Sequence, residues 1–188
     1  GPGYANIIER KCALCSLPDF IPQDKQNCRD CDSWSDGKFK HDKELRIKHV
    51  LEGNDIKYTS HDKIPESACS KYRPDFIIDL GPMCIILEVD ENQHKSYACE
   101  CEEKRMLQLY QDFGGIPLVF IRYNPDDYID NNGKKCEGRL YNLTRETVLV
   151  NLIKRIISLV ESDRYEIMQL SVYYLYYNGF GSDIFRSV

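Results

Sequence analysis

Long apolar runs in the middle of the chain predict the strands of a buried sheet. Residues 75–80, 83–89 and 116–123 are apolar almost throughout, which is typical of strands that are covered on both faces. Gly81 and Pro82 place a tight turn between the first two runs, so these runs predict a β-hairpin. A short strand is expected at residues 56–60, and the alternating pattern of residues 165–177 predicts another.

Apolar residues recur at helical spacing in three other segments. Residues 41–52 and residues 98–113 each predict a helix that ends at a glycine, and residues 144–160 predict a long amphipathic helix with Thr144 as its N-cap. The order of elements is helix, strand, hairpin, helix, strand, helix, strand, which predicts an α/β fold. The core-facing positions of the second helix are expected to be Met106, Leu109, Tyr110 and Phe113.

Composition and charge narrow the class of protein. With 188 residues, 42% of them hydrophobic, the chain can bury one core and carry a small appendage. No apolar run approaches the roughly 18 residues that a membrane-spanning helix needs. The net charge of −5 argues against bulk nucleic-acid binding. Net charge does not, however, reveal a carboxylate metal site that lies inside a locally basic rim. Gly1 and Pro2 are expected to be the remnant of a protease-cleaved tag.

Four cysteines near the N-terminus have the spacing of zinc ligands. Cys12 and Cys15 form one C-x2-C pair, and Cys28 and Cys31 form a second. Two such knuckles close a tetrahedral zinc site. The alternative is disulfide bonding, which a C-x2-C pair is too short to form within itself without strain. The predicted organisation is a tail at residues 1–3, a zinc-binding module at residues 4–36 and a main domain at residues 37–188.

Three carboxylates lie at the ends of the predicted hairpin strands. Asp75 begins one strand and Glu88 lies toward the end of its partner, so antiparallel pairing places them opposite each other. Asp90 follows Glu88 by two residues and therefore points to the same face. Converging carboxylates repel one another unless a hard cation such as Mg²⁺ lies between them. The alternative is a set of surface carboxylates paired with Arg73 or Lys95.

Three motifs, RPDF (residues 73–76), EVDENQH (residues 88–94) and IRYNPD (residues 121–126), give the chain a family resemblance. Over residues 11–135 it resembles the PD-(D/E)XK nuclease superfamily, and within it the very-short-patch-repair and homing-endonuclease-like proteins. It is also similar to proteins of giant DNA viruses that combine such motifs with cysteine knuckles. The resemblance implies a restriction-endonuclease-like core, in which helices flank a mixed sheet. It also implies an endonuclease that cuts double-stranded DNA with Mg²⁺ or Mn²⁺.

The resemblance assigns roles to the acids and to one histidine. Asp75 matches the aspartate that binds the catalytic magnesium, and Glu88 falls at the second acidic position. Asp90 stands where the usual motif has lysine, so no cation is expected at that place. Repair-type relatives without this lysine use a histidine, which implies that His94 takes a proton from the attacking water. The alternative for His94 is a solvated loop residue.

Two further positions follow from the same resemblance. Glu44 on the first predicted helix matches an acidic position that faces the active site, with an ordinary exposed glutamate as the alternative. Lys104, or its neighbour Arg105, lies one turn into the second helix and could supply the missing positive charge.

The remaining cysteines suggest a second zinc site. Repair endonucleases of this type carry a structural zinc close to the active site, and the analogy implies Cys69, Cys99, Cys101 and Cys136 as its ligands. Scattered free cysteines are the alternative, because C-x-C is a weaker signal than C-x2-C. Cys84 lies inside an apolar strand and is expected to be a core residue.

Two rival functions stay open beside the DNA endonuclease. One is a catalytically inactive module that binds nucleic acid through its zinc knuckles, and the other is an RNA-directed nuclease. A decayed site should have lost Asp75 or Glu88, and the chain keeps both. Zinc thiolates need a reducing compartment, so the cytoplasm or nucleus of a host cell is the expected location, without a membrane anchor.

Overall fold

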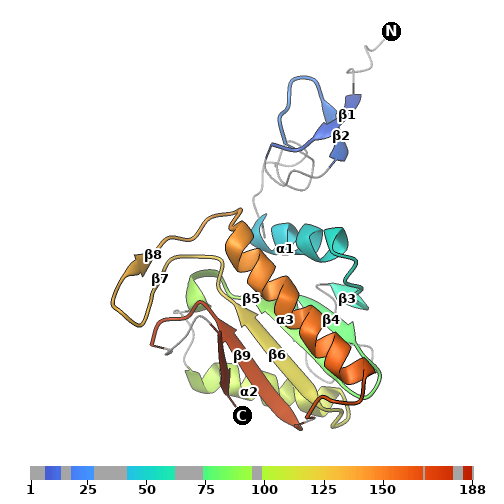
Figure 1. Cartoon of the computed structure of the whole chain (residues 1–188), viewed down its shortest axis with the longest axis vertical. Coiled ribbons are helices and arrows are strands. Elements are labelled where there is room, and N and C mark those ends of the chain that lie inside the picture. Colours follow the sequence, from blue (N-terminus) through green and yellow to red (C-terminus); the bar gives the residue numbers. More distant parts are fainter. Residues whose placement is uncertain are drawn as a thin grey trace.

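The main body of the protein is a mixed β-sheet between helices (Figure 1). The computed structural model describes residues 7–13, 18–27, 42–61, 74–94, 99–166, 168–179 and 184–187. Six strands form the main sheet in the order β10-β9-β6-β5-β4-β3. Their bounds are β3 Ser60–His61, β4 Phe76–Asp79, β5 Cys84–Val89, β6 Leu118–Tyr123, β9 Leu170–Leu175 and β10 Ile184–Ser187.

The centre of this sheet is parallel and its two sides are antiparallel. Strand β6 runs parallel to both β5 and β9, whereas β4 pairs antiparallel with β5, β3 with β4, and β10 with β9. Every residue of β5 and of β6 is buried. A strand that is covered on both faces has no side that contacts water. Its residues are therefore apolar at successive positions and do not alternate with polar ones.

Helices cover both faces of the sheet. Helices α1 (Asp42–Gly53) and α3 (Leu143–Glu161) lie side by side on one face, as Figure 1 shows, and share a core with the residues of β5 and β6 that point toward them. Helix α2 (Cys99–Asp112) covers the other face through Met106 and Leu109. The short 3-10 helix η1 (Glu91–His94) follows β5 directly. Within the described residues, no helix is long and apolar enough to cross a membrane.

The α/β fold with a mixed sheet and flanking helices confirms the prediction from hydrophobic patterning. The hairpin is present as β4 and β5, and β9 falls inside the predicted segment 165–177. Two details of the prediction were wrong. The short strand begins only at Ser60, and the N-cap of α3 is Asn142, whose side chain accepts a hydrogen bond from the Arg145 N–H at 3.2 Å. Asparagine offers this acceptor two residues before Thr144.

Two small hairpins were not predicted. Strands β1 (Ile7–Lys11) and β2 (Pro18–Pro22) pair antiparallel in the N-terminal segment. Strands β7 (Tyr128–Ile129) and β8 (Lys135–Cys136) pair within the polar segment that follows β6. Three of the four predicted zinc ligands of the N-terminal module, Cys15, Cys28 and Cys31, lie outside the described residues.

Candidate metal-binding and active site

Asp75 and Glu88 meet at one end of the β4–β5 hairpin. Phe76 pairs with Leu87, so the next position of the antiparallel register places Asp75 opposite Glu88. Both side chains belong to the face that α2 covers, because they alternate with Phe76 and Leu87 of the opposite core. The Val89 N–H donates a 2.7 Å hydrogen bond to the Asp75 Oδ2 and fixes that carboxylate. Glu88 is 5% exposed, so the pair lies at the margin of the core.

Asp90 is bound by a partner from β6 and a partner from the turn that follows β9. Its side chain is fully buried, and its Oδ2 accepts a 2.5 Å hydrogen bond from Arg122 Nε and another from the Tyr177 hydroxyl. The expectation that no cation stands at this position was wrong. In the parallel pairing of β5 with β6, Arg122 is the register partner of Glu88, which brings its guanidinium beside Asp90. Strand register alone creates this contact.

Arg122 connects Asp90 to helix α2. Its Nη2 lies 2.5 Å from the Glu102 Oε2, so one buried guanidinium bridges two carboxylates. Burial opposes the charge of Arg122, but the hydrogen bond and the charge of Asp90 outweigh it and raise the pKa of the guanidinium. Burial, followed by the charge of Asp90, raises the pKa of Tyr177. Tyr177 therefore remains a protonated donor and Arg122 remains a cation at neutral pH.

The backbone of His94 lies at the same edge of the sheet. His94 is the last residue of η1, four positions after Asp90 in the chain. Its side chain, and Lys95, are outside the described part of the structure. The preceding residue, Gln93, adopts a left-handed backbone with φ 55° and bonds to Asn178 beyond β9. The catalytic role of His94 stays a prediction.

The first turn of α1 reaches this edge from the other face. Lys43 Nζ lies 2.5 Å from Asp126 Oδ1 and 3.5 Å from Glu91 Oε2. Its neighbour Glu44, predicted to face the active site, is 6% exposed and is therefore not an ordinary surface glutamate. Burial opposes the charge of Lys43, but the hydrogen bond to Asp126 and the charges of Asp126 and Glu91 outweigh it and raise the pKa of Lys43.

The predicted cations on α2 differ in their surroundings. Lys104 is exposed on the helix, and its ammonium makes no ion pair within the described residues. Arg105 Nη1 lies 3.6 Å from Glu102 Oε1. Within the described residues, Arg122 places a positive charge 2.5 Å from Asp90 of the acidic motif, and it was not among the predicted site residues.

The cysteines of both predicted zinc sites are described only in part. Cys12 is buried directly after β1, whereas Cys69 lies outside the described residues. Cys99 and Cys101 stand in the first turn of α2, with side chains that are not described, and Cys136 is half-buried in β8. Both zinc sites stay predictions. Cys84 is a core residue, as expected, and burial followed by the charge of Asp79 raises its pKa to about 11.

The donor set near the hairpin suits a hard cation only in part. In the described ranges, no three or more His, Cys, Asp or Glu side chains come together as a ready metal cluster. Asp75 and Glu88 supply carboxylate oxygens on adjacent strands, which fits a magnesium ion that keeps several water ligands. The Asp90 Oδ2 already accepts hydrogen bonds from Arg122 and Tyr177, so this oxygen is not available as a third metal ligand.

The motif IRYNPD has a structural role in addition to contributing Arg122. Asn124 is fully buried; its Nδ2 donates to the Tyr176 carbonyl at 2.8 Å, and its Oδ1 accepts from the Asp126 N–H at 2.9 Å. Arg145 Nη1 donates to the carbonyls of Asn124 and Asp126 at 3.1 and 2.7 Å. An arginine inside an apolar run needs a buried acceptor, and this signal could have identified Arg122 from the sequence.

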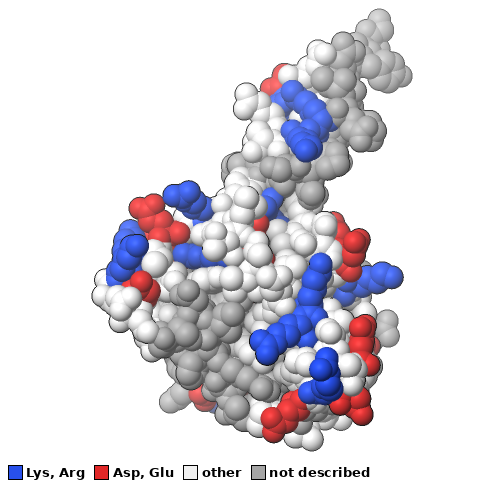
Figure 2. All heavy atoms as spheres, viewed as in Figure 1, with Lys and Arg blue, Asp and Glu red and all other residues white. Residues whose placement is uncertain are grey.

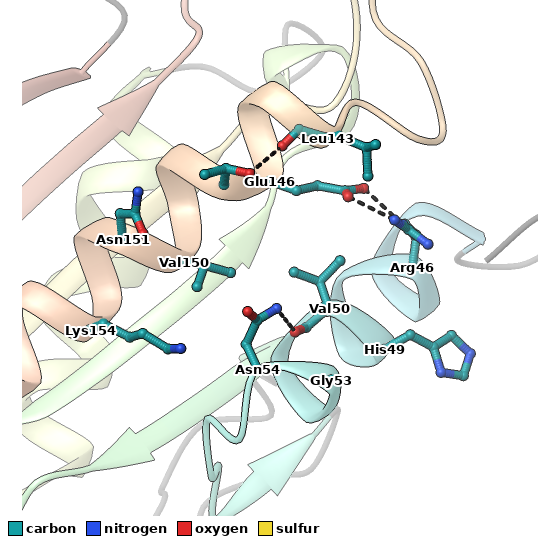
Figure 3. A pocket seen from close by; sticks show the side chains of 11 residues that line it. Arg46, His49, Val50, Gly53, Asn54, Leu143, Glu146, Val150, Asn151 and Lys154 are labelled. Atoms are coloured by element: carbon teal, nitrogen blue, oxygen red, sulfur yellow. Dashed lines mark hydrogen bonds and ion pairs between the residues drawn. The ribbon is translucent and has the colours of Figure 1, made fainter. Parts of the chain in front are cut away.

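A cavity of about 360 Å³ with polar side chains in its lining lies between α1 and α3. Asp75, Glu88 and Asp90 are not among its lining residues. Figure 3 shows Val50 and Val150 on its inner wall, with Asn54, Asn151 and Lys154 around it. Above it, Arg46 and Glu146 form two parallel hydrogen bonds of 2.8 and 2.7 Å. Among the described residues, Lys and Arg are interspersed with Asp and Glu on the face that Figure 2 shows.

Comparison of the chain with protein-family models, with curated proteins and with solved structures finds no match.

Proposed function

We propose that this protein is a metal-dependent endonuclease that hydrolyses phosphodiester bonds of double-stranded DNA. The observation that carries the proposal is the placement of Asp75 opposite Glu88, at the end of a hairpin within a mixed sheet flanked by helices. A carboxylate pair on adjacent strands, with a helix and a parallel strand following, is the arrangement that the resemblance to PD-(D/E)XK nucleases implies. Fold and motif thus agree, although neither identifies the substrate.

In this proposal Asp75 and Glu88 hold Mg²⁺ or Mn²⁺. When bound, such an ion lowers the pKa of a water ligand and neutralises charge on the phosphate. The Val89 N–H orients the Asp75 carboxylate through its 2.7 Å bond. Asp90 acts as an anchor and not as a metal ligand, because Arg122 compensates its charge. Two carboxylates then face the cation, and His94 accepts the proton of the attacking water.

The test removes one metal ligand without changing its shape. Asp75→Asn should abolish magnesium-dependent nicking or cutting of supercoiled plasmid, because the neutral amide binds a hard cation poorly. Asp79→Asn is the matched control, since Asp79 lies at the other end of the same strand and caps the Gly81 N–H at 2.8 Å. Wild-type activity of Asp75→Asn would exclude this site. Cleavage of single-stranded RNA instead of plasmid would redirect the proposal to RNA.

We also propose a structural zinc ion in the N-terminal module, held by Cys12, Cys15, Cys28 and Cys31. Metal analysis of the purified protein should find at least one tightly bound zinc per chain. A second equivalent that is lost in Cys136→Ser would support the site formed with Cys69, Cys99 and Cys101. Rapid reaction of all four N-terminal thiols in the native protein would contradict the first site, because zinc-bound thiolates are protected.

A further inference from the structure

The turn that follows β9 is fastened to the segment that carries the candidate site. The Tyr177 hydroxyl donates to Asp90 Oδ2. One residue later, the Asn178 N–H donates to Gln93 Oε1 at 2.8 Å, and Gln93 Nε2 donates back to Asn178 Oδ1 at 3.1 Å. These residues are 85 or more positions apart in sequence, so the bonds join the last part of the sheet to η1.

Both sides of this junction adopt backbone conformations that need support. Gln93 and Tyr176 have φ angles of 55° and 64°, in the left-handed region that side chains other than glycine rarely adopt. A residue in this region persists only where its surroundings fix it. The Tyr176 ring packs edge-on against Tyr123 and Tyr128, with centroids 6.2 and 5.7 Å away. Hydrogen bonds to Asn178 hold Gln93 in its left-handed conformation.

A continuous series of contacts leads from this turn to the acidic pair. Tyr177 binds the Asp90 side chain, and the Asp90 N–H donates to the Tyr123 carbonyl at 2.8 Å. Val89, between Asp90 and Glu88, binds the Asp75 carboxylate through its N–H. A shift of Asp90 would therefore move both Glu88 and the donor that orients Asp75.

We propose that Tyr177 and Asn178 are positioning residues of the candidate site, which hold Asp90 and η1 so that Glu88 stays opposite Asp75. The catalytic consequence rests on the proposed endonuclease function. The structural consequence, a fixed segment 89–94, does not depend on it. The two can therefore be tested separately.

The first experiment measures amide hydrogen exchange in the full chain. Tyr177→Phe keeps the ring, which packs 5.2 Å from that of Tyr174, and removes only the hydroxyl. Exchange at residues 89–94 should become about tenfold faster, as expected when a partner that orients a site is lost. Tyr110→Phe is the matched control. Tyr110 also donates its hydroxyl across elements, to Gln169 Oε1 at 2.8 Å just before β9 begins, and its loss should leave residues 89–94 unchanged.

The second experiment measures cleavage as a function of Mg²⁺ concentration. The half-saturating Mg²⁺ concentration should rise about tenfold or more in Tyr177→Phe, with little change in KM for DNA. Asn178→Asp keeps the Oδ1 acceptor used by Gln93 and by the Ile129 N–H, and should retain wild-type metal dependence. Asn178→Leu removes this acceptor and should behave like Tyr177→Phe.

The outcomes separate the two proposals. A wild-type protein that neither binds Mn²⁺ nor cuts DNA overturns the endonuclease proposal, and the exchange rates then decide alone whether the turn holds residues 89–94. Unchanged exchange in Tyr177→Phe overturns the positioning inference. Faster exchange with unchanged metal dependence in an active enzyme also overturns it, because the contacts would then be structural only.

Discussion

Two buried arginine–carboxylate pairs show how the same chemistry serves two different regions of this protein. Arg46 and Glu146 join α1 to α3 by two parallel hydrogen bonds, the fork geometry that guanidinium and carboxylate groups favour. Arg122 instead divides its bonds between Asp90 after β5 and Glu102 on α2, and Asp90 also accepts from Tyr177. The first pair connects two helices. The second joins three strands and a helix at the edge that carries the candidate site.

This difference has an energetic meaning. A buried ion pair is costly to desolvate, and apolar residues of similar volume often replace both partners without loss of stability. Such replacement preserves stability when the two partners make few bonds to other polar groups. Asp90 and Arg122 also satisfy Tyr177 and Glu102, so removing them would leave those two groups without their present partners.

Replacement of both partners should therefore separate the two pairs, and this is the largest expected effect. The single substitution Glu146→Ala should lower the free energy of unfolding by about 3–5 kcal/mol, since it leaves the buried charge of Arg46 without its carboxylate. Asp90→Ala should lower it by about 1–3 kcal/mol, because the Tyr177 hydroxyl loses its acceptor while Glu102 still faces Arg122. The double substitution Arg46→Met with Glu146→Leu should recover most of the loss caused by Glu146→Ala. Arg122→Met with Asp90→Leu should not, because each polar group left unsatisfied costs about 1–3 kcal/mol.

Urea unfolding at constant pH provides the measurement for all four proteins. Equal recovery in both double variants would show that Tyr177 and Glu102 find new partners, and the distinction between the pairs would then be lost. Unchanged slopes of the unfolding curves would confirm that the substitutions act on the folded state.

An intermediate effect is expected at alkaline pH, because the carboxylate of the second pair accepts a hydrogen bond from the hydroxyl of the buried Tyr177. Burial and Asp90 hold the pKa of Tyr177 above its ordinary value of about 10. The stability from this shift is full below pH 10, where both states are protonated, and declines as the unfolded tyrosine ionises above it. Tyr177→Phe should reduce the loss of stability between pH 9 and 11, measured by urea unfolding, relative to the wild type. The same slope in both proteins would contradict a raised pKa.

The smallest effect is expected at an exposed ion pair of the β7–β8 hairpin. Lys135 Nζ lies 3.0 Å from Asp127 Oδ2, but the two side chains are 67% and 50% exposed. Solvent screens such a pair, so Lys135→Ala should leave the free energy of unfolding nearly unchanged. A thermal melt in low and in high salt would check this. A loss comparable with that of Asp90→Ala would show that burial does not explain the difference between these pairs.

Local patterning predicted much of the fold. The apolar runs of β5 and β6 and the helical spacing of Met106 and Leu109 in α2 needed no tertiary information, because a residue's periodicity reports the face that it buries. The opposition of Asp75 and Glu88 was predictable for the same reason. Their turn is short enough to fix the antiparallel register.

The sequence by itself thus determined the three helices, the central strands with their hairpin, and the acidic pair, since each depends on residues close together in the chain. Only the tertiary structure decided the partners of Asp90. Arg122 and Tyr177 stand 32 and 87 residues away from it and reach it because β5, β6 and β9 are neighbours in the sheet. The order of parallel strands depends on how helices pack across the sheet, which no local pattern specifies.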